Sequence, residues 1–286
     1  MNIIPIEKMC FGTMTFGCKG IFDKIGMSDY SEAESMIRYV YERGITRFDT
    51  ASGYSDGESE KMLGRAISAI SSEVSISTKV CRSLSTTNSI DLSYKNIIKS
   101  CERSLYNLGV DNVSTLYLHD FDKDTTLTES IDALEHLCDR QLIDNYGVCN
   151  YNYTQLKNII EIGSERLRYV QYRYSLLENN FTSEIRKLVN RHNINFVAYS
   201  LLAGGILTGK YLISPDNENF RLNRLGVNKI SHNSYQVEEI KKMADKLNTS
   251  IEYLAINHVI QDVDYGIFGA RNLFQVKSLM RAIGHE

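Results

Sequence analysis

The sequence lacks several features that mark membrane, secreted and nucleic-acid-binding proteins. No apolar run approaches the roughly 18 residues that a bilayer span needs. The first residues lack the basic and apolar regions of a signal peptide. The net charge of −3 and the pI near 6.1 provide no basic excess for nucleic acid or a membrane surface. We therefore expect a cytoplasmic protein that binds neither.

Cysteine patterns of metal sites and disulfide frameworks are also missing. The six cysteines are scattered without a CxxC pair or a Cys/His ligand spacing. Such an arrangement is typical of reduced, mostly buried thiols. The sequence therefore predicts no metal site. The cysteines are Cys10, Cys18, Cys81, Cys101, Cys138 and Cys149.

What the chain does contain is an alternation, about eight times, of short apolar runs and longer amphipathic stretches. The runs are rich in Val, Ile, Tyr and Phe, as buried parallel strands are. They are Cys10–Phe16, Ile45–Asp49, Val74–Lys79, Thr115–His119, Ile143–Val148, Tyr169–Tyr172, Asn195–Tyr199 and Tyr265–Phe268. No linker interrupts residues 1–286, and the GxGxxG motif that usually follows the first strand of an open dinucleotide-binding sheet is absent. The pattern favours a single (β/α)8 TIM barrel.

Helical patterns occupy the stretches between these runs. The sequence from Ser31 to Glu34 matches a capping box and predicts a helix that ends at Gly44. Other predicted helices are Leu92–Leu108, Leu127–Leu137, Tyr153–Ile162, Thr182–Arg191, Ser234–Lys246, Ile251–Ile260 and Asn272–Ile283. The insert Leu201–Asn233, between the seventh and eighth strands, is predicted to be irregular. Inserts of this length inside a compact domain are usually functional loops or lids.

Chemically distinctive residues stand at the ends of three consecutive predicted strands. Asp49 ends the second, Lys79 the third and His119 the fourth, while Tyr54 follows Asp49 by five residues. The active site of a barrel lies where strands end and loops begin. We therefore expect these four side chains to lie together and to be partly desolvated.

The four residue types suit the reduction of a carbonyl group. Hydride addition to C=O needs a proton for the developing alkoxide, and a tyrosine near pKa 10 is a weak donor unless it is tuned. The ammonium of Lys79 would favour the Tyr54 phenolate and lower its pKa, and Asp49 would hold Lys79 charged. His119 could hydrogen-bond and orient the substrate oxygen.

Each of the four also has an ordinary explanation. Asp49 could cap a turn, Tyr54 could serve only packing, and His119 could be a core histidine. Lys79 could instead form a Schiff base, as in aldolases and lyases. A further alternative is a barrel that binds a nucleotide as a sensor without catalysis. The coincidence of the four residues at consecutive strand ends favours the oxidoreductase.

Several segments resemble the motifs of the aldo-keto reductase family, in collinear order over nearly the whole chain. The motifs are FDTASGYSDGESEKMLGRAI (Phe48–Ile67), STKV (Ser77–Val80), LYLHDFD (Leu116–Asp122), GVCN (Gly147–Asn150), VQYRYSLLE (Val170–Glu178), VAYSLLAGGILTGKY (Val197–Tyr211) and FGARN (Phe268–Asn272). The resemblance implies a (β/α)8 barrel and a nicotinamide cofactor bound without a Rossmann domain. It also implies that the four residues above form the catalytic tetrad.

The resemblance assigns further residues to the cofactor. Asn150 and Gln171 would hold the nicotinamide carboxamide, and Tyr199 would stack on the ring. Gly204 and Gly205 would let the backbone approach the pyrophosphate. The full set is Gly12, Thr13, Met14, Asn150, Gln171, Tyr199, Ser200, Leu202, Gly204, Gly205, Leu207, Lys210, Gly269, Ala270, Arg271 and Gln275.

The identity of the cofactor depends on the last predicted helix, whose N-terminus is a natural anion site. Arg271 and Gln275 could meet a 2′-phosphate there, which favours NADP, although NAD is possible. The Glu-Asn pair that usually serves the adenine in the family is replaced by Ser278-Leu279. Because leucine cannot hydrogen-bond adenine, the preference between NAD and NADP stays open.

The substrate is expected to be a small carbonyl compound or sugar. LSYKNIIKSCERSLYNLG, LHDFD and RYSLLE resemble the branch of the family that acts on sugars and aldoses, including aldose 1-dehydrogenases. The chain ends at Glu286, whereas family members generally continue into a tail that walls the substrate pocket. We therefore expect an open site, which accepts a bulky or polar substrate or is completed by a partner. Cys149 stands where the family often has serine, and the oligomeric state is not indicated.

Overall fold

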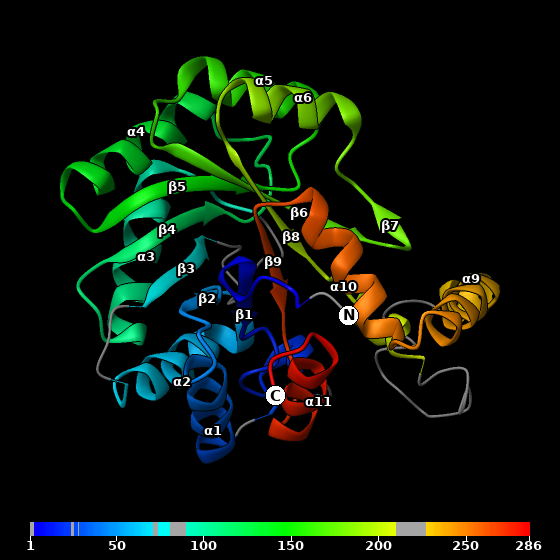
Figure 1. Ribbon diagram of the computed structural model, residues 1–286. Coiled ribbons are helices and arrows are strands. Elements are labelled where there is room, and N and C mark those ends of the chain that lie inside the picture. Colours follow the sequence, from blue (N-terminus) through cyan, green and yellow to red (C-terminus); the bar gives the residue numbers. More distant parts are fainter. Residues whose placement is uncertain (1–2, 24–25, 28, 71–73, 81–89, 210–226) are drawn as a thin grey trace.

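Eight parallel strands form a closed barrel. The computed structural model describes residues 3–23, 26–27, 29–70, 74–80, 90–209 and 227–286. The barrel strands are β1 (Met9–Gly12), β2 (Arg47–Asp49), β3 (Ser75–Val80), β4 (Val113–Leu118), β5 (Ile143–Cys149), β6 (Leu167–Ser175), β8 (Asn195–Tyr199) and β9 (Tyr265–Phe268). They pair in chain order, and β9 returns to β1 (Figure 1). The predicted (β/α)8 barrel is confirmed.

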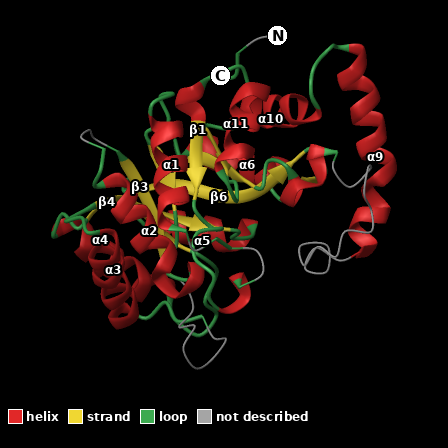
Figure 2. Cartoon of the chain, turned by 90° about the horizontal axis from the view of Figure 1, so that it is seen from below, coloured by secondary structure: helices red, strands yellow, loops and turns green. Residues whose placement is uncertain are grey.

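Helices surround the barrel and connect its strands, as the two views in Figures 1 and 2 show. They are α1 (Tyr30–Tyr41), α2 (Glu58–Ile67), α3 (Tyr94–Leu108), α4 (Leu127–Asp139), α5 (Tyr153–Ile162), α6 (Ser183–Arg191), α9 (Val227–Lys246), α10 (Ile251–Asp262) and α11 (Leu273–Ala282). Short 3-10 turns are η1 (Ile6–Lys8), η2 (Gly20–Phe22), η3 (Tyr54–Gly57) and η4 (Ala203–Thr208), and β7 (Glu178–Asn179) pairs antiparallel with β6. None of the described helices is long and apolar enough to cross a membrane.

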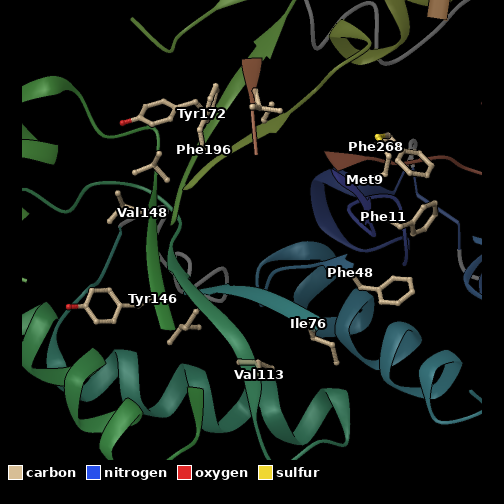
Figure 3. Packing of buried hydrophobic residues seen from close by; sticks show 14 of the residues in the cluster. Met9, Phe11, Phe48, Ile76, Val113, Tyr146, Val148, Tyr172, Phe196 and Phe268 are labelled. Atoms are coloured by element: carbon tan, nitrogen blue, oxygen red, sulfur yellow. The ribbon is translucent and has the colours of Figure 1, made fainter. Parts of the chain in front are cut away.

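The alternation of side chains along the strands separates the core from the site. Phe48 in β2 is fully buried in the large apolar cluster that also contains Phe11 and Phe268, whose rings meet edge to face 5.3 Å apart (Figure 3). The next residue, Asp49, bonds to Gln171 of β6, which is not a neighbour of β2 in the sheet. Since strand side chains alternate between faces, Asp49 points into the barrel.

Strand and helix boundaries follow the predictions closely where local signals mark both ends. β8, β9 and α5 have the predicted bounds. β1 was predicted to reach Phe16 and ends at Gly12, because Phe16 N donates back to the carbonyl of Thr13 in a turn, at 2.8 Å. The remaining barrel strands differ from their predictions by one to a few residues.

One expectation for the start of a helix is wrong, and one helix was missed. The N-cap of α1 is Asp29, whose carboxylate accepts from the backbone N of Ser31 and Glu32, so Ser31 lies inside the helix. The helix α2 was not predicted. It follows Ser55 and Asp56, which adopt left-handed backbone angles with φ of 50° and 55°. Positive φ is uncommon for residues other than glycine, so no simple sequence rule places the start of a helix directly after this pair.

The insert after β8 is more regular than expected. It opens with η4, and α9 begins at Val227, so the predicted irregular stretch to Asn233 is too long. A second apolar cluster joins η4 to α9 and α10; its buried members are Ala203, Ile206, Leu207, Val237, Ala244, Ile251 and Ala255. Lys210 and the residues up to 226 lie outside the described residues.

Candidate active site

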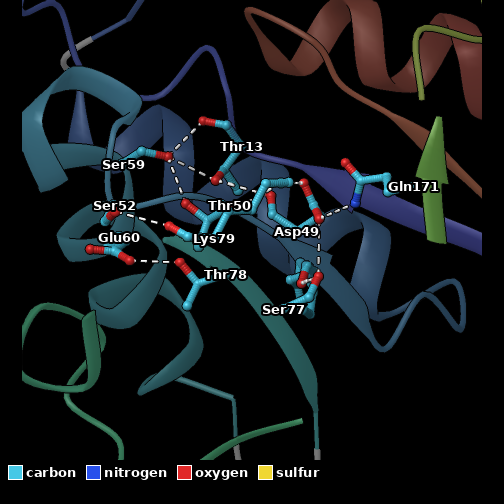
Figure 4. Close-up of polar contacts among 11 residues, drawn as sticks. Thr13, Asp49, Thr50, Ser52, Ser59, Glu60, Ser77, Thr78, Lys79 and Gln171 are labelled. Carbon is cyan, nitrogen blue, oxygen red and sulfur yellow. Dashed lines mark hydrogen bonds and ion pairs between the residues drawn. The ribbon is translucent and has the colours of Figure 1, made fainter. Parts of the chain in front are cut away.

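A buried ion pair lies at the carboxyl ends of β2 and β3. Lys79 Nζ donates to Asp49 Oδ1 and to the carbonyl oxygen of Thr50, at 2.8 Å (Figure 4). Lys79 is 1% exposed and Asp49 is 3% exposed. An unpaired charge at this depth would be strongly destabilising, so the geometry of the pair fixes both side chains.

The second oxygen of the Asp49 carboxylate accepts hydrogen bonds from side chains of β3 and β6. Ser77 Oγ donates to Asp49 Oδ2 at 3.0 Å, and Gln171 Nε2 donates to the same atom at 3.0 Å. Ser77 lies on β3 and Gln171 lies across the barrel on β6. The carboxylate therefore accepts from three side chains and cannot rotate away from Lys79 without losing buried hydrogen bonds.

Tyr54 and His119 complete the predicted group of four. Tyr54 is the first residue of η3, and its ring centre lies 5.2 Å from Lys79 Nζ. His119 directly follows β4, and its ring meets the Tyr54 ring edge to face at 5.9 Å. Phe22 packs against the Tyr54 ring at 5.8 Å. The structure thus brings the four residues together, with Tyr54 between the ammonium and the imidazole.

Burial dominates the electrostatics of this group. It raises the pKa of Tyr54 to about 12, the charge of Lys79 lowers it, and that of Asp49 raises it. Burial disfavours the ammonium of Lys79, yet Asp49 raises the pKa of Lys79 above its usual value. Lys79 therefore acts on Tyr54 in the predicted direction, but desolvation outweighs it and the phenol is a weaker acid than tyrosine in water.

A hydroxyl network fixes the loop that carries Tyr54. Ser59 Oγ donates to the carbonyl of Thr13 at 2.7 Å, and it lies 2.8 Å and 3.0 Å from the hydroxyls of Thr13 and Thr50 (Figure 4). Ser52 Oγ donates to the carbonyl of Lys79 at 2.9 Å. These bonds tie the loop after β2 to β1 and β3. The side chain of Thr13, expected at the cofactor, is fully buried in this network.

The residues expected to hold the nicotinamide lie together: Asn150 follows β5, Gln171 lies within β6, and Tyr199 ends β8. Tyr199 Oη donates to Asn150 Oδ1 at 3.1 Å, and Asn150 N donates to the carbonyl of Gln171 at 3.0 Å. Asn150 has φ of 59°, which turns the chain sharply after β5. The amide of Gln171 reaches Asp49, so the expected carboxamide site adjoins the ion pair.

The backbone after β8, where the pyrophosphate is expected, turns through several left-handed residues. Gly204 and Gly205 have φ of 69° and 96°, which residues with a Cβ rarely adopt, and Ser200 has φ of 65°. Half-buried Leu202 precedes them. Leu207 is fully buried in the second apolar cluster, so in this conformation it offers a ligand no surface. Gly205 N donates to the carbonyl of Leu202 at 2.8 Å, so a pyrophosphate would need the other N–H groups of this turn.

At the start of α11, side-chain oxygens already accept hydrogen bonds from several backbone N–H groups. Gln275 N donates to Asn272 Oδ1, and Gln275 Oε1 accepts from Arg271 N, both at 2.9 Å. Buried Ala270 accepts at its carbonyl from Thr15, whereas Gly269 is exposed. Asn272 therefore caps the helix, and Gln275 uses only its amide oxygen in the bond to Arg271 N. Its amide nitrogen is the atom that would donate to a 2′-phosphate.

The remaining assigned residues lie on β1 and just after it. Gly12 is paired in register with Asp49, and Met14 is 40% exposed. Three positions differ from the usual residues of the family. Cys149 is the buried last residue of β5, Leu279 packs in the core, and Ser278 is exposed. Leu279 therefore has neither the chemistry nor the position to bond adenine.

Two residues with contacts at the site were not assigned a role from the sequence. Ser77 holds Asp49, and its signal was present, because it stands two residues before Lys79 and so shares a strand face with it. Glu32 accepts from the backbone N of Leu273 at 2.6 Å. Its contact spans 241 residues of sequence, and no local pattern reports it.

Comparison with known proteins identifies the family. The family model described as "Aldo/keto reductase family" matches residues 8–286. The chain belongs to the aldo/keto reductase family. With this membership over nearly its whole length, the protein is an NAD(P)H-dependent oxidoreductase.

Relatives with the family fold carry more than one name. A probable voltage-gated potassium channel subunit beta of Arabidopsis thaliana is 28% identical over 291 residues, which cover 95% of this chain and 87% of the relative. An aldo-keto reductase of Bacillus subtilis is 24% identical over 91% of this chain and 81% of its own. The family thus includes proteins named as enzymes and proteins named as channel subunits.

Solved structures share the whole barrel. A glycerol dehydrogenase from Gluconobacter oxydans superposes with a TM-score of 0.83 at 25% identity, covering 97% of this chain and 86% of that one. An aldo/keto reductase from Klebsiella pneumoniae, solved with NADP and acetate, has a TM-score of 0.76 at 21% identity, with the same coverage. The second similarity establishes the fold alone.

Proposed function

We propose that the protein is an NADP-dependent oxidoreductase that interconverts a carbonyl and an alcohol on a sugar or related compound, with Tyr54 as the general acid and base. The observation that carries this proposal is the buried Lys79–Asp49 ion pair directly beside Tyr54, with His119 against the same ring. A fully buried ion pair is costly to build, and such pairs beside a tyrosine mark a site of tuned acid–base chemistry.

A bound nicotinamide would supply or accept the hydride. The chain's own residues handle the proton: Tyr54 Oη donates it to the developing alkoxide, and the Lys79 ammonium stabilises the phenolate that remains. Asp49 keeps Lys79 charged and in place. His119 hydrogen-bonds the substrate oxygen and orients it towards Tyr54. In the oxidative direction, Tyr54 accepts the proton from the alcohol.

The cofactor assignment rests on the residues at the barrel mouth. Asn150, Gln171 and Tyr199 form one group beside the ion pair and suit a carboxamide and an aromatic ring. Gly204 and Gly205 fit the pyrophosphate. Two structural neighbours from Klebsiella pneumoniae were solved with NADP and NADPH, which supports NADP as the first cofactor to test. Lys210 stays a predicted contact.

A polyhydroxylated substrate is supported by the neighbour from Gluconobacter oxydans, which is named a glycerol dehydrogenase and is 25% identical to this chain. The resemblance of several segments to the sugar-acting branch points the same way. We expect a small polyol, sugar or related aldehyde as substrate, handled without nucleic acid. The cytoplasmic location expected from the sequence also stays a prediction.

The test begins with cofactor binding. NADPH and NADH are titrated by fluorescence, and the tighter ligand is used to screen aldehydes, sugars and polyols in both directions. We expect binding below millimolar concentration and turnover of at least one sugar or polyol. Tyr54→Phe should lower turnover by about 10²- to 10⁴-fold while cofactor binding persists. No binding of either cofactor, or unchanged turnover in the variant, would overturn the proposal.

A second candidate is a non-catalytic cofactor sensor, favoured by the relatives named as potassium channel subunits. This candidate predicts cofactor binding without turnover of any carbonyl or alcohol in the panel. The Schiff-base alternative has less support, because a nucleophilic lysine needs a lowered pKa and Asp49 raises that of Lys79. Borohydride with a carbonyl substrate should accordingly leave Lys79 unlabelled.

A further inference from the structure

A carboxylate from another helix occupies the N-terminus of α11. Glu32 Oε1 accepts a hydrogen bond from the backbone N of Leu273, the first residue of α11, at 2.6 Å. Glu32 itself lies in the first turn of α1, whose N-cap is Asp29. The two helices lie side by side on the outside of the barrel (Figure 1). The carboxylate therefore sits where the positive ends of two helix dipoles meet.

An opposite charge stands at the same helix end. Arg271 precedes the N-cap Asn272 by one residue, and its backbone N is bonded to Gln275. In the described ranges its guanidinium forms no ion pair, whereas Glu32 is committed to Leu273. The start of α11 thus combines an arginine that suits a phosphate with a glutamate that repels one.

The two side chains favour different cofactors. An acidic residue at the adenosine ribose accepts hydrogen bonds from a free 2′-hydroxyl, which is the usual recognition of NAD, whereas a nearby arginine accommodates the 2′-phosphate of NADP. A 2′-phosphate at this position would meet the Glu32 charge and would compete with it for the N–H of Leu273. A ribose 2′-hydroxyl carries no charge and can donate to the free carboxylate oxygen.

We propose that Glu32 sets the cofactor preference by opposing the 2′-phosphate, so that the protein accepts NAD alongside NADP. The inference rests on the proposed function, because it takes the adenosine ribose to lie at the start of α11. It assigns Glu32 a specificity role and leaves the chemistry of hydride transfer unchanged.

Glu32→Gln tests this directly, since the amide oxygen can still accept from Leu273 N while the charge is removed. Dissociation constants for NADPH and NADH are measured by fluorescence titration at low salt. We expect NADPH to bind about tenfold more tightly. NADH should change little, because the 2′-hydroxyl can accept from the amide nitrogen instead of donating to the carboxylate, so the ratio of the two constants shifts about tenfold. Added salt should shrink the difference by screening.

A matched control lies on the same helix turn. Glu34 pairs with Arg38 at 3.0 Å instead of with α11, so Glu34→Gln removes an equal charge and should leave the ratio unchanged. Arg271→Gln should move the ratio the opposite way, weakening NADPH more than NADH. Equal shifts in the Glu32 and Glu34 variants would overturn the specific role of Glu32.

The outcomes separate this inference from the proposed function. Wild-type protein that binds neither cofactor contradicts both. Wild-type protein that binds, with an unchanged ratio in Glu32→Gln, contradicts only the inference. If the variant fails to fold, the ratio of the two dissociation constants of the wild type decides. We expect the dissociation constant for NADH to lie within roughly tenfold of that for NADPH. A preference for NADPH above roughly a thousandfold would overturn the role of Glu32.

Discussion

At Asp49, one step along a strand changes the environment from apolar core to polar site. Phe48 is fully buried against the surrounding helices, and Asp49 is fully buried inside the barrel among polar partners. The carboxylate is shielded from solvent, and among the described residues its charge is supported by Lys79, Ser77 and Gln171. The stability of the barrel and the chemistry of the site therefore depend on the same group of residues.

Removing the positive partner should show this dependence. Lys79→Met leaves the Asp49 carboxylate buried without its cation, and we expect a loss of about 3–5 kcal/mol in the free energy of unfolding. Urea unfolding followed by circular dichroism measures the change. The double variant with Asp49→Asn removes both charges and should recover most of the loss. A single variant as stable as the wild type would show that the pair is not desolvated.

The raised pKa of Tyr54 predicts different pH dependences for the two directions. With a pKa of about 12, the phenol stays protonated at neutral pH. Reduction needs the protonated form, so its kcat/KM should hold between about pH 8 and pH 10 and fall only as the pH passes through that pKa. Oxidation needs the phenolate, so its kcat/KM should rise about tenfold per pH unit over this range. A plateau in the oxidation profile near pH 8 would contradict the assignment.

Sequence reasoning located these residues because their position is a local property. Asp49, Lys79 and His119 each follow an apolar run, and strand ends meet on one face of a barrel. The acidity of Tyr54 could not be predicted in the same way. The pKa of Tyr54 is raised because the side chain is buried, and Phe22 contributes to this burial from a different loop. No spacing in the sequence indicates that contact.

At the scale of elements, α2 shows what a local pattern hides. Its start follows two left-handed residues, and a glycine in its middle weakens the helical pattern. That glycine has a tertiary cause: a Cβ built on Gly64 would lie 2.2 Å from the carbonyl oxygen of Leu108 in α3. The close approach of α3 requires glycine there, and a contact of this kind is invisible before the fold is known.

Gly64→Ala should therefore be costly despite the higher helix propensity of alanine. The methyl group would meet backbone, which cannot swing aside as a side chain can, and we expect a loss of about 1–3 kcal/mol from overpacking. Urea denaturation provides the measurement. Lys61→Ala, on the exposed face of the same helix, should stay within about 0.5 kcal/mol of wild type. A stabilised Gly64 variant would mean that α2 and α3 are not packed this closely.

For the molecule as a whole, the barrel joins two halves of one site. The four residues of the proton-transfer group come from the ends of β2 to β4, and most of the expected cofactor residues come from the segment between β5 and α11. The hydrogen bond between Asp49 and Gln171 crosses the barrel and connects them. The number and order of strands could be predicted because each apolar run marks one strand, whereas this cross-barrel contact required the closed sheet.

Cofactor binding should consequently stabilise the entire barrel. A ligand that binds only the folded chain adds RT ln(1 + [L]/Kd), or about 2.7 kcal/mol at a hundred times Kd. For a chain of this size we expect NADPH at that concentration to raise the melting temperature by roughly 5–10 °C. Thermal unfolding followed by circular dichroism measures the shift, with nicotinamide alone at equal concentration as the control. Nicotinamide lacks the pyrophosphate and adenosine that would contact η4 and α11, so its shift should be much smaller. Equal shifts would mean that the pyrophosphate and adenosine add no binding energy, and would contradict the contacts expected at Gly204 and Gly205.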